Sequence, residues 1–439
     1  SFFNWRWILN KGFIYYKQKV MFWLVESKVQ FEQFSNSNWK KVFIELIPNS
    51  YLIHPSQNNI CALYIRPLVS TKGFIVPLHH SETLNVNITD VNTMLHKFDS
   101  IYVRDKKEFL HYLPLKGLFD INQQNPPYIP ELLQTHNIFN KKYPNKKNIN
   151  KIIPIVKHYE YCEEIYSNLK DKINEPINEF YNNKVSMVFN SIERSGIRVN
   201  KEKFETHFHP IDGEYIYTQY NFKTLTGRPS NKFKGVNYAA LNKENNSRES
   251  FIPRNDTFIE FDIGAYHPTL LAKLVDFDFG NEDIHSSFAK MYGVEYKKAK
   301  ELTFKQLYGG VFDQYKHLEF FKKVQVYTDK LWKEFNEKGW VECPISKHRF
   351  EKKKLNEMKP QKLLNYLLQN LETAMNVHIL WEIIKLLKNK KTKLVLYTYD
   401  SFLFDVSKEE EKVLGEIKNL FSKHKLQIKT CYGDNYNFK

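Results

Sequence analysis

Two segments that each read as a β-strand carrying an aspartate place the strongest constraint on how this chain folds. Residues 257–263 (TFIEFDI) alternate as a strand does, and Asp262 lies near their end, shortly before Pro268, where a helix is expected to begin. Residues 393–406 contain two apolar runs around Asp400, which predicts a hairpin with this aspartate at its tip. A strand end is a common place for a carboxylate to hold a divalent cation. Taken alone, however, each aspartate is better explained as an ordinary turn residue.

A third segment, residues 295–310 (EYKKAKELTFKQLYGG), lies between these two and is expected to be helical. Its Lys300, Phe304 and Tyr308 recur at every fourth position, so they share one face of the helix. A basic group followed by two aromatic rings along one stripe suits the binding of a nucleoside triphosphate. In isolation, the stripe is better explained as a core-facing surface with a lysine that extends to solvent.

Taken together and in this order, the three segments resemble the polymerase motifs of the family A (DNA polymerase I-like) DNA polymerases. Further segments that follow the family's order support the resemblance: Thr226-Gly227-Arg228, Asn237-Tyr238-Ala239-Ala240-Leu241, Asp283-Ile284-His285, Gly339-Trp340-Val341-Glu342, and the pair Asn365 and Gln369. The resemblance covers residues 178–439. It implies a right-hand polymerase palm with fingers at about 281–345, and an enzyme that extends a DNA primer on a template.

The resemblance also implies roles for individual residues. Asp262 and Asp400 would hold two Mg²⁺ ions and, with Lys300, would form the catalytic centre at which pyrophosphate is released. The residues expected to bind the incoming nucleotide are His285, Lys300, Phe304, Tyr308 and His267. The residues expected to contact DNA are Arg228, Asn237, Asn365 and Gln369. The expected ligands are therefore primer–template DNA and deoxynucleoside triphosphates (dNTPs).

The sequence departs from the family's pattern at several places. The fifth residue after the first aspartate is usually Glu and is His267 here, and the residue after the second aspartate is usually Glu and is Ser401. We hypothesise that sugar selection rests on His267 with Tyr308 and is looser than usual. The short stretch from Asn200 to Thr226 leaves little room for the family's long helical thumb. This predicts low processivity, or a processivity, helicase or primase partner.

The N-terminal part resembles the 3′–5′ exonuclease-like domain of the same family, which has a ribonuclease H-like α/β fold. That activity needs several carboxylates around two metal ions. The corresponding segments offer Glu45, Asp105 and Glu163 as possible remnants, with Glu108 beside Asp105, and do not reproduce the family's full pattern. We therefore expect a degenerate domain that has lost proofreading. The predicted division of this α/β and α+β multidomain chain is an N-terminal extension (1–30), the exonuclease-like domain (31–165), a connecting helix with a thumb remnant (166–225) and the polymerase palm with its fingers (226–439).

Composition is compatible with this interpretation but does not carry it. The formal net charge is +16 and aromatic residues make up 15% of the chain, which favours a polyanionic partner, nucleic acid before an anionic membrane. AT-rich codon usage explains the same enrichment without any function. The cysteines, Cys61, Cys162, Cys343 and Cys431, are too scattered for a readable zinc site or a disulfide framework. A reducing, intracellular compartment is expected, and divergence with compactness suggests a viral or mobile-element protein that acts in host cytoplasm.

Three alternatives stay open. A single-subunit RNA polymerase shares the two aspartates and the lysine–tyrosine helix, although Phe304 and the Thr-Gly-Arg segment favour the DNA enzyme. A catalytically inactive DNA-binding scaffold would keep the basic surface but would have no reason to pair Asp262 and Asp400 with Lys300. A protein bound to a membrane surface is the weakest alternative, because the basic charge is spread along the chain and no amphipathic or membrane-spanning segment is evident.

Overall fold

The computed structural model describes residues 7–9, 12–17, 20–35, 39–121, 147–231, 236–280 and 282–438. The chain divides into two compact units, Ser1–Asn190 (unit 1) and Ser191–Lys439 (unit 2). The predicted N-terminal extension falls partly outside the described residues, and the four-part division made from the sequence stays a prediction. No described helix combines the length and the apolar character that crossing a membrane requires.

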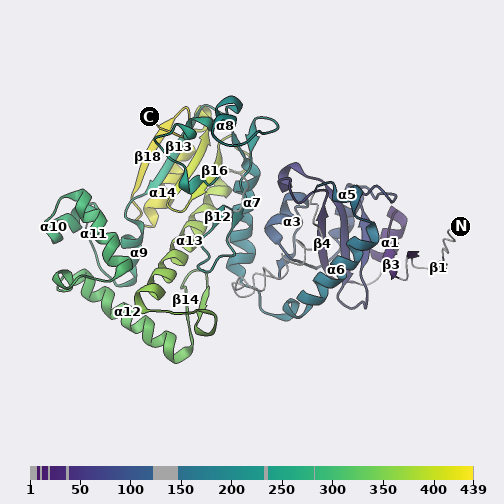
Figure 1. Ribbon diagram of the computed structural model, residues 1–439, viewed down its shortest axis with the longest axis horizontal. Coiled ribbons are helices and arrows are strands. Elements are labelled where there is room, and N and C mark those ends of the chain that lie inside the picture. Colours follow the sequence, from purple (N-terminus) through teal and green to yellow (C-terminus); the bar gives the residue numbers. More distant parts are fainter. Residues whose placement is uncertain are drawn as a thin grey trace. The chain divides into compact units, whose positions relative to one another are not determined.

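Unit 1 is built around an eight-stranded sheet with the order β1-β2-β3-β6-β5-β4-β7-β8 (Figure 1). The strands are β1 (Trp7–Leu9), β2 (Gly12–Lys17), β3 (Val20–Leu24), β4 (Lys41–Pro48), β5 (Ile60–Pro67), β6 (Phe74–Pro77), β7 (Ser100–Val103) and β8 (Leu118–Asp120). Strands β4, β5 and β6 are antiparallel neighbours. Strand β7 runs parallel to β4, and β8 runs parallel to β7.

Both faces of this sheet are buried, because successive side chains along a strand point to opposite sides. On β4, Val42 and Ile44 belong to one apolar core and Phe43 and Ile47 to the other. Among the described residues, the helices of unit 1 are α1 (Lys28–Ser35), α2 (Ile88–Leu95), α3 (Lys106–Tyr112), α5 (Ile149–Ile152) and α6 (Ile155–Leu169). Residues of α1, α2 and α3 complete the first core, and residues of α5 and α6 complete the second. A π-helical segment (Phe180–Val185) then leads into α7 (Ser186–Ser195).

Unit 2 contains an antiparallel sheet with the order β16-β17-β13-β18. Its strands are β13 (Thr257–Ile263), β16 (Lys393–Thr398), β17 (Ser401–Val406) and β18 (Ile428–Gly433). The strand predicted at 257–263 and the hairpin predicted around Asp400 are both confirmed. Both could be predicted because short apolar runs with alternating neighbours leave few other ways to bury their side chains.

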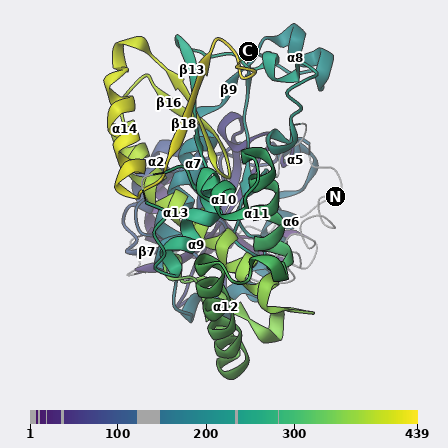
Figure 2. The same cartoon turned by 90° about the vertical axis from the view of Figure 1, so that its left-hand side faces the viewer.

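Most helices of unit 2 lie beside and below this sheet in Figure 1, whereas α8 lies at its upper end, and α10 and α11 come to the front in Figure 2. They are α8 (Lys201–His207), α9 (Tyr266–Leu274), α10 (Ile284–Tyr292), α11 (Tyr296–Gly309), α12 (Glu319–Lys338), α13 (Pro360–Leu386) and α14 (Lys412–Lys423). The long helix α13 contacts α9, α11, α12 and α14 and is therefore central to the packing of the helices of unit 2. The predicted helix at 295–310 is confirmed as α11.

Short strand pairs complete unit 2. They are β9 (Ile197–Arg198) with β10 (Tyr215–Ile216), β11 (Tyr220–Asn221) with β12 (Ser230–Asn231), and β14 (Trp340–Glu342) with β15 (Arg349–Glu351). Between Asn200 and Thr226, where every residue is described, the structure has one helix, the seven-residue α8.

Candidate active site

The two aspartates singled out in the sequence lie on neighbouring strands. Asp262 on β13 faces Ser401, the first residue of β17, in the antiparallel register. The backbone N–H of Ile263 donates to the carbonyl oxygen of Asp400 at 2.9 Å. Opposed residues of an antiparallel pair have Cα atoms about 5 Å apart, so the two carboxylates share one end of the sheet. Segments far apart in the sequence thus bring two acidic groups together.

Burial makes the ionisation of both carboxylates less favourable, and the charge of Asp262 adds to this effect at Asp400. The pKa of Asp400 is raised to about 6, mainly by burial and then by the negative charges of Asp262 and Glu372. Burial also raises the pKa of Asp262, while Lys429, Lys243 and Lys300 oppose that shift. Among the described residues, no ion pair joins Asp262 or Asp400 to a cationic side chain. Two crowded carboxylates without such a partner are the donor set that hard divalent cations prefer.

The backbone beside both aspartates is strained. Tyr399, which precedes Asp400 in the hairpin turn, has φ +59°, and Ala265, just after Asp262, has φ +48°. Non-glycine residues rarely adopt these values, and such strain is concentrated at functional sites. The turn is held by Asn376 on α13, whose side-chain amide donates to the carbonyl oxygen of Tyr399 at 2.6 Å. The position of Asp400 is therefore fixed from outside its own hairpin.

Helix α11 directs its predicted nucleotide-binding stripe towards the same place. The rings of Phe304 and Tyr308 stack with centroids 6.1 Å apart and an interplanar angle of 19°. Lys300 is exposed, and it is near enough for its charge to lower the pKa of Asp262. The stripe is therefore not a core-facing surface, since Lys300 and Tyr308 are both exposed.

His285 on α10 is buried beside this stripe. Its ring centroid is 6.2 Å from that of Phe304 and 5.9 Å from that of Tyr296. Burial lowers the pKa of His285. The negative charge of Asp283 opposes this shift, and the positive charges of Lys300 and Lys429 add to it. The Nδ1 atom of His285 has no hydrogen-bond partner among the described residues. It is therefore a polar atom that a ligand could satisfy.

His267, at the position where the family pattern has Glu, is bonded to a carboxylate from another helix. The Nε2 atom of His267 lies 2.5 Å from Oε2 of Glu372 on α13. The hydroxyl of Tyr308 lies 2.6 Å from Nδ1 of the same imidazole. A chain of hydrogen bonds thus connects the exposed ring of Tyr308 to a carboxylate that is 2% exposed.

The predicted DNA-contacting residues converge on α13, with one exception. The hydroxyl of Thr226 donates to Gln369 at 3.1 Å, and the Gln369 amide donates to Asn365 at 3.2 Å. Arg228 lies 3.2 Å from Glu372 and stacks 3.9 Å from the centre of the Tyr399 ring. The exception is Asn237, which is exposed and precedes a 3-10 turn.

Sequence reasoning missed two carboxylates, Glu372 and Glu260. Glu372 follows Gln369 by three residues on α13, and Glu260 precedes Asp262 by two residues on β13, so each shares a face with a residue that was identified. Glu260 accepts a hydrogen bond from the hydroxyl of Ser401 at 2.6 Å. The family pattern has Glu at two positions that are occupied by His267 and Ser401 in this chain. Each of these two residues is bonded to a carboxylate from a neighbouring element. The signal in the sequence that could have identified Glu372 and Glu260 is the face that each shares with a residue already singled out.

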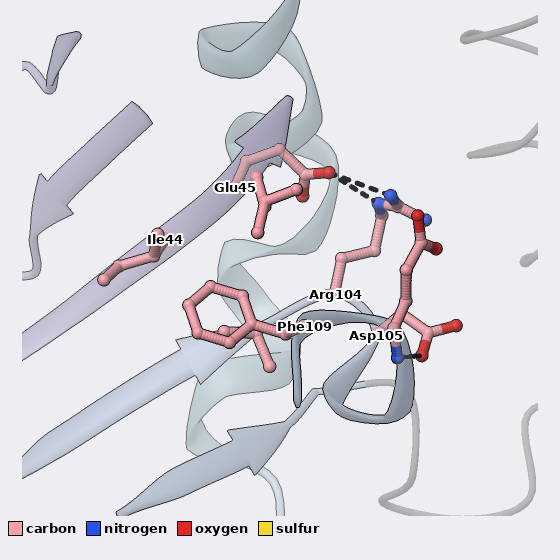
Figure 3. A pocket seen from close by; sticks show the side chains of 8 residues that line it. Ile44, Glu45, Arg104, Asp105 and Phe109 are labelled. Carbon is pink, nitrogen blue, oxygen red and sulfur yellow. Dashed lines mark hydrogen bonds and ion pairs between the residues drawn. The ribbon is translucent and has the colours of Figure 1, made fainter. Parts of the chain in front are cut away.

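In unit 1, the predicted acidic residue Glu45 is bonded to an arginine, unlike the two aspartates of unit 2 (Figure 3). Glu45 on β4 is buried and accepts hydrogen bonds from Nε and Nη2 of Arg104 at 3.0 and 2.9 Å. Burial raises the pKa of Glu45, and Arg104 opposes that shift. Asp105 caps helix α3 by accepting from the backbone N–H of Glu108 at 2.9 Å. A pocket lined by these residues thus contains a guanidinium group beside its buried carboxylate.

Glu163, the third predicted exonuclease residue, has an arginine partner of its own. It accepts hydrogen bonds from Arg66 at 2.7 and 2.8 Å, from the hydroxyl of Tyr64 at 2.8 Å and from the backbone N–H of Gly73 at 2.8 Å. Arg66 also lies 4.7 Å from the centre of the Tyr166 ring. Glu45 and Glu163 are therefore engaged by separate arginines.

The sequence matches no protein-family model and no curated protein. The fold is similar to a solved structure, the POL domain of Pol1 from M. smegmatis in complex with DNA primer-template and dNTP. The match has a TM-score of 0.67 and 13% sequence identity, and it covers 94% of this chain and 99% of that chain. At this identity the likeness shows the fold alone, and the family A resemblance of the sequence stays a prediction. This chain is a mixed α/β multidomain protein whose fold is similar to that of a polymerase POL domain.

Proposed function

We propose that this protein is a template-directed DNA polymerase that adds deoxynucleotides to a primer 3′ end and releases pyrophosphate. The observation that carries the proposal is the meeting of Asp262 and Asp400 beside the Lys300, Phe304 and Tyr308 face of α11. A fold similar to that of a POL domain solved with primer-template and dNTP supports it. The family A assignment made from the sequence belongs to the same proposal.

The donor set at the two aspartates fits Mg²⁺, because it consists of carboxylate oxygens that lie close together and that form no ion pair with a cationic side chain among the described residues. Asp262 and Asp400 would hold the ions. Bound there, two Mg²⁺ ions would activate the primer 3′-hydroxyl and neutralise charge on the triphosphate. Asn376 keeps Asp400 in place through the carbonyl group of Tyr399.

The remaining groups would bind and orient the nucleotide. Lys300 supplies a positive charge for the triphosphate and can donate a proton to the leaving pyrophosphate. His285 offers its unpartnered Nδ1 atom to a phosphate oxygen or to a water molecule. Phe304 and Tyr308 present stacked rings against which a base and a sugar can pack.

The DNA would lie along α13 and the Thr226-Gly227-Arg228 segment. Arg228, Asn365 and Gln369 present donors and acceptors that suit a duplex minor groove, which is read by shape more than by sequence. Asn237 would add a further contact. With one short helix between Asn200 and Thr226, we expect short extension products unless a processivity, helicase or primase partner holds the DNA.

We further propose that unit 1 is a ribonuclease H-like, exonuclease-type domain without proofreading activity. The β4–β6 meander, continued by the parallel strands β7 and β8, supports the fold. The ion pairs Arg104–Glu45 and Arg66–Glu163 support the loss of activity, because each guanidinium places a positive charge where metal ions would be needed. Degradation of a mismatched 3′ end that Glu45→Ala abolishes would contradict this.

Primer extension with Mg²⁺ tests the polymerase proposal. The wild-type chain should extend a labelled DNA primer on a DNA template with dNTPs, and Asp400→Asn should abolish extension. The matched control is Asp313→Asn, which removes an aspartate that is 95% exposed and should leave extension unchanged. Synthesis without a primer would favour an RNA polymerase instead, and DNA binding without any incorporation would favour an inactive scaffold.

A further inference from the structure

Glu372 is a buried carboxylate shared between two groups of the proposed site. Its side chain is 3% exposed, and a charge buried to this extent requires compensating partners. Oε1 lies 3.2 Å from Nη2 of Arg228, and Oε2 lies 2.5 Å from Nε2 of His267. One carboxylate on α13 therefore connects the segment proposed to contact DNA with His267 on α9.

The bond to Glu372 sets how His267 meets Tyr308. When the Nε2 hydrogen is donated to the carboxylate, a neutral imidazole presents Nδ1 as an acceptor. The hydroxyl of Tyr308 lies 2.6 Å from this atom and can donate its hydrogen there. The pKa of Tyr308 is raised to about 12 by burial and then by Glu372, so the phenol keeps the hydrogen that this bond needs.

The anchored end of Tyr308 lies on the side of the reacting centre. The charges of Arg228 and Asp400 both act on its hydroxyl, and Glu372 in turn acts on Asp400. The opposite end of the stripe continues to Phe304 and then to Lys300 on α11. A nucleotide packed on this stripe would therefore place its sugar, which joins the triphosphate to the base, against the anchored ring of Tyr308.

We propose that Glu372 is a positioning residue for sugar selection, acting through His267 to hold the ring of Tyr308 as a fixed wall of the nucleotide site. A fixed wall excludes the additional 2′-hydroxyl of a ribonucleotide, whereas a released tyrosine can change rotamer and admit it. This inference rests on the proposed polymerase function. It goes beyond the hypothesis made from the sequence, which assigned sugar selection to His267 and Tyr308 without any carboxylate.

The test is single-nucleotide incorporation opposite one template base, measured as kcat/KM for the dNTP and for the matching ribonucleotide. Glu372→Gln should lower the ratio of the two values by about tenfold, because a charge-assisted hydrogen bond is lost. The matched control is Glu382→Gln on the same helix, where the carboxylate is 48% exposed and pairs with Lys385. That control should leave the ratio unchanged.

Two further variants separate positioning from general damage to the fold. His267→Leu breaks the relay at its centre and should reduce the ratio as much as Glu372→Gln does. His267→Gln keeps one donor and one acceptor and should retain more selectivity than His267→Leu. Adding Glu372→Gln to His267→Leu should cause no further loss, since both substitutions break one chain of interactions.

A ratio unchanged within about twofold in both Glu372→Gln and His267→Leu, with normal dNTP incorporation, would overturn the inference and leave the polymerase function standing. A wild-type chain that incorporates no nucleotide would instead refute the proposed function, and the inference with it. If Glu372→Gln does not fold, the comparison of His267→Leu with His267→Gln decides between the two outcomes.

Discussion

Each unit of this protein gathers acidic side chains, and the two units compensate their charge in different ways. In unit 1, Glu45 and Glu163 are each bonded to an arginine, Arg104 and Arg66. In unit 2, Asp262 lies opposite Ser401, the residue after Asp400, so the two aspartates lie close together, and the pKa of Asp400 rises to about 6. Carboxylates thus form ion pairs with arginine in one unit, whereas in the other they lie close together without an ion-pair partner among the described residues.

This difference teaches that the number of carboxylates alone does not predict a metal site. A guanidinium group is a permanent cation with donors in fixed directions, so a carboxylate bonded to it has little to gain from a metal ion. Two neighbouring carboxylates, one of which raises the pKa of the other, gain from any cation that lies between their charges. The hydrogen-bond and ion-pair partners of a carboxylate therefore indicate whether it can bind a metal ion better than its presence alone does.

The largest expected difference is between variants in which one acidic residue of each unit is replaced. Asp262→Asn should reduce Mg²⁺-dependent primer extension by at least about 1000-fold, because a metal-binding carboxylate is lost. Glu45→Gln should change the extension rate by less than about twofold, because Glu45 has no part in the reaction. Single-turnover extension rates measure both. Equal losses in the two variants would remove the distinction between the units.

The next effect concerns stability. Arg104→Met leaves Glu45 buried without its partner and should lower the free energy of unfolding of unit 1 by about 3–5 kcal/mol. Urea unfolding followed by circular dichroism measures this loss. The matched control, Arg349→Met, breaks the exposed pair with Glu342 and should cost less than about 1 kcal/mol. Similar losses for both would show that Arg104 is no more than a surface partner.

The pH dependence separates the two units further. Mg²⁺ binds the ionised carboxylate, and the pKa of Asp400 is about 6 before metal binds. The Mg²⁺ concentration for half-maximal extension should therefore rise about tenfold for each pH unit below 6 and level off above it. Extension rates at several Mg²⁺ concentrations between pH 5 and pH 8 measure this, in assays where the DNA remains paired. A requirement that does not change with pH would contradict an uncompensated Asp400.

The smallest effect is on the metal-free protein. The pKa of Asp400 is raised from 3.8 to about 6, so the stability it contributes is present below pH 4 and is lost as the pH rises through 6. Without Mg²⁺ at pH 8, Asp400→Asn should therefore stabilise unit 2 by about 1 kcal/mol. This value is smaller than the full pKa shift implies, because solvent still reaches part of this residue. Urea unfolding at pH 4 should show no such difference. An Asp400→Asn variant that is less stable than the wild type at pH 8 would contradict the predicted direction of this change in stability.

Local patterns predicted the elements that carry the site better than they predicted the contacts within it. The limits of β13 and the hairpin at Asp400 follow from alternating apolar residues, and the α11 stripe follows from helical spacing. Glu372 and His267 are 105 residues apart, and periodicity says nothing about which side chains meet across such a distance. The same holds for Arg104, which stands next to a predicted acid in the sequence but bonds to Glu45 on another strand. Side-chain partners between elements needed the structure.

The contrast between the units is tested most directly by locating metal ions. Crystals of the protein with primer–template DNA, a non-hydrolysable dNTP analogue and Mn²⁺ would reveal the ions by anomalous diffraction. We predict manganese peaks between the carboxylates of Asp262 and Asp400, and none in the pocket where Arg104 is bonded to Glu45. Manganese beside Glu45, with none at the two aspartates, would contradict the assignment of the catalytic centre to unit 2.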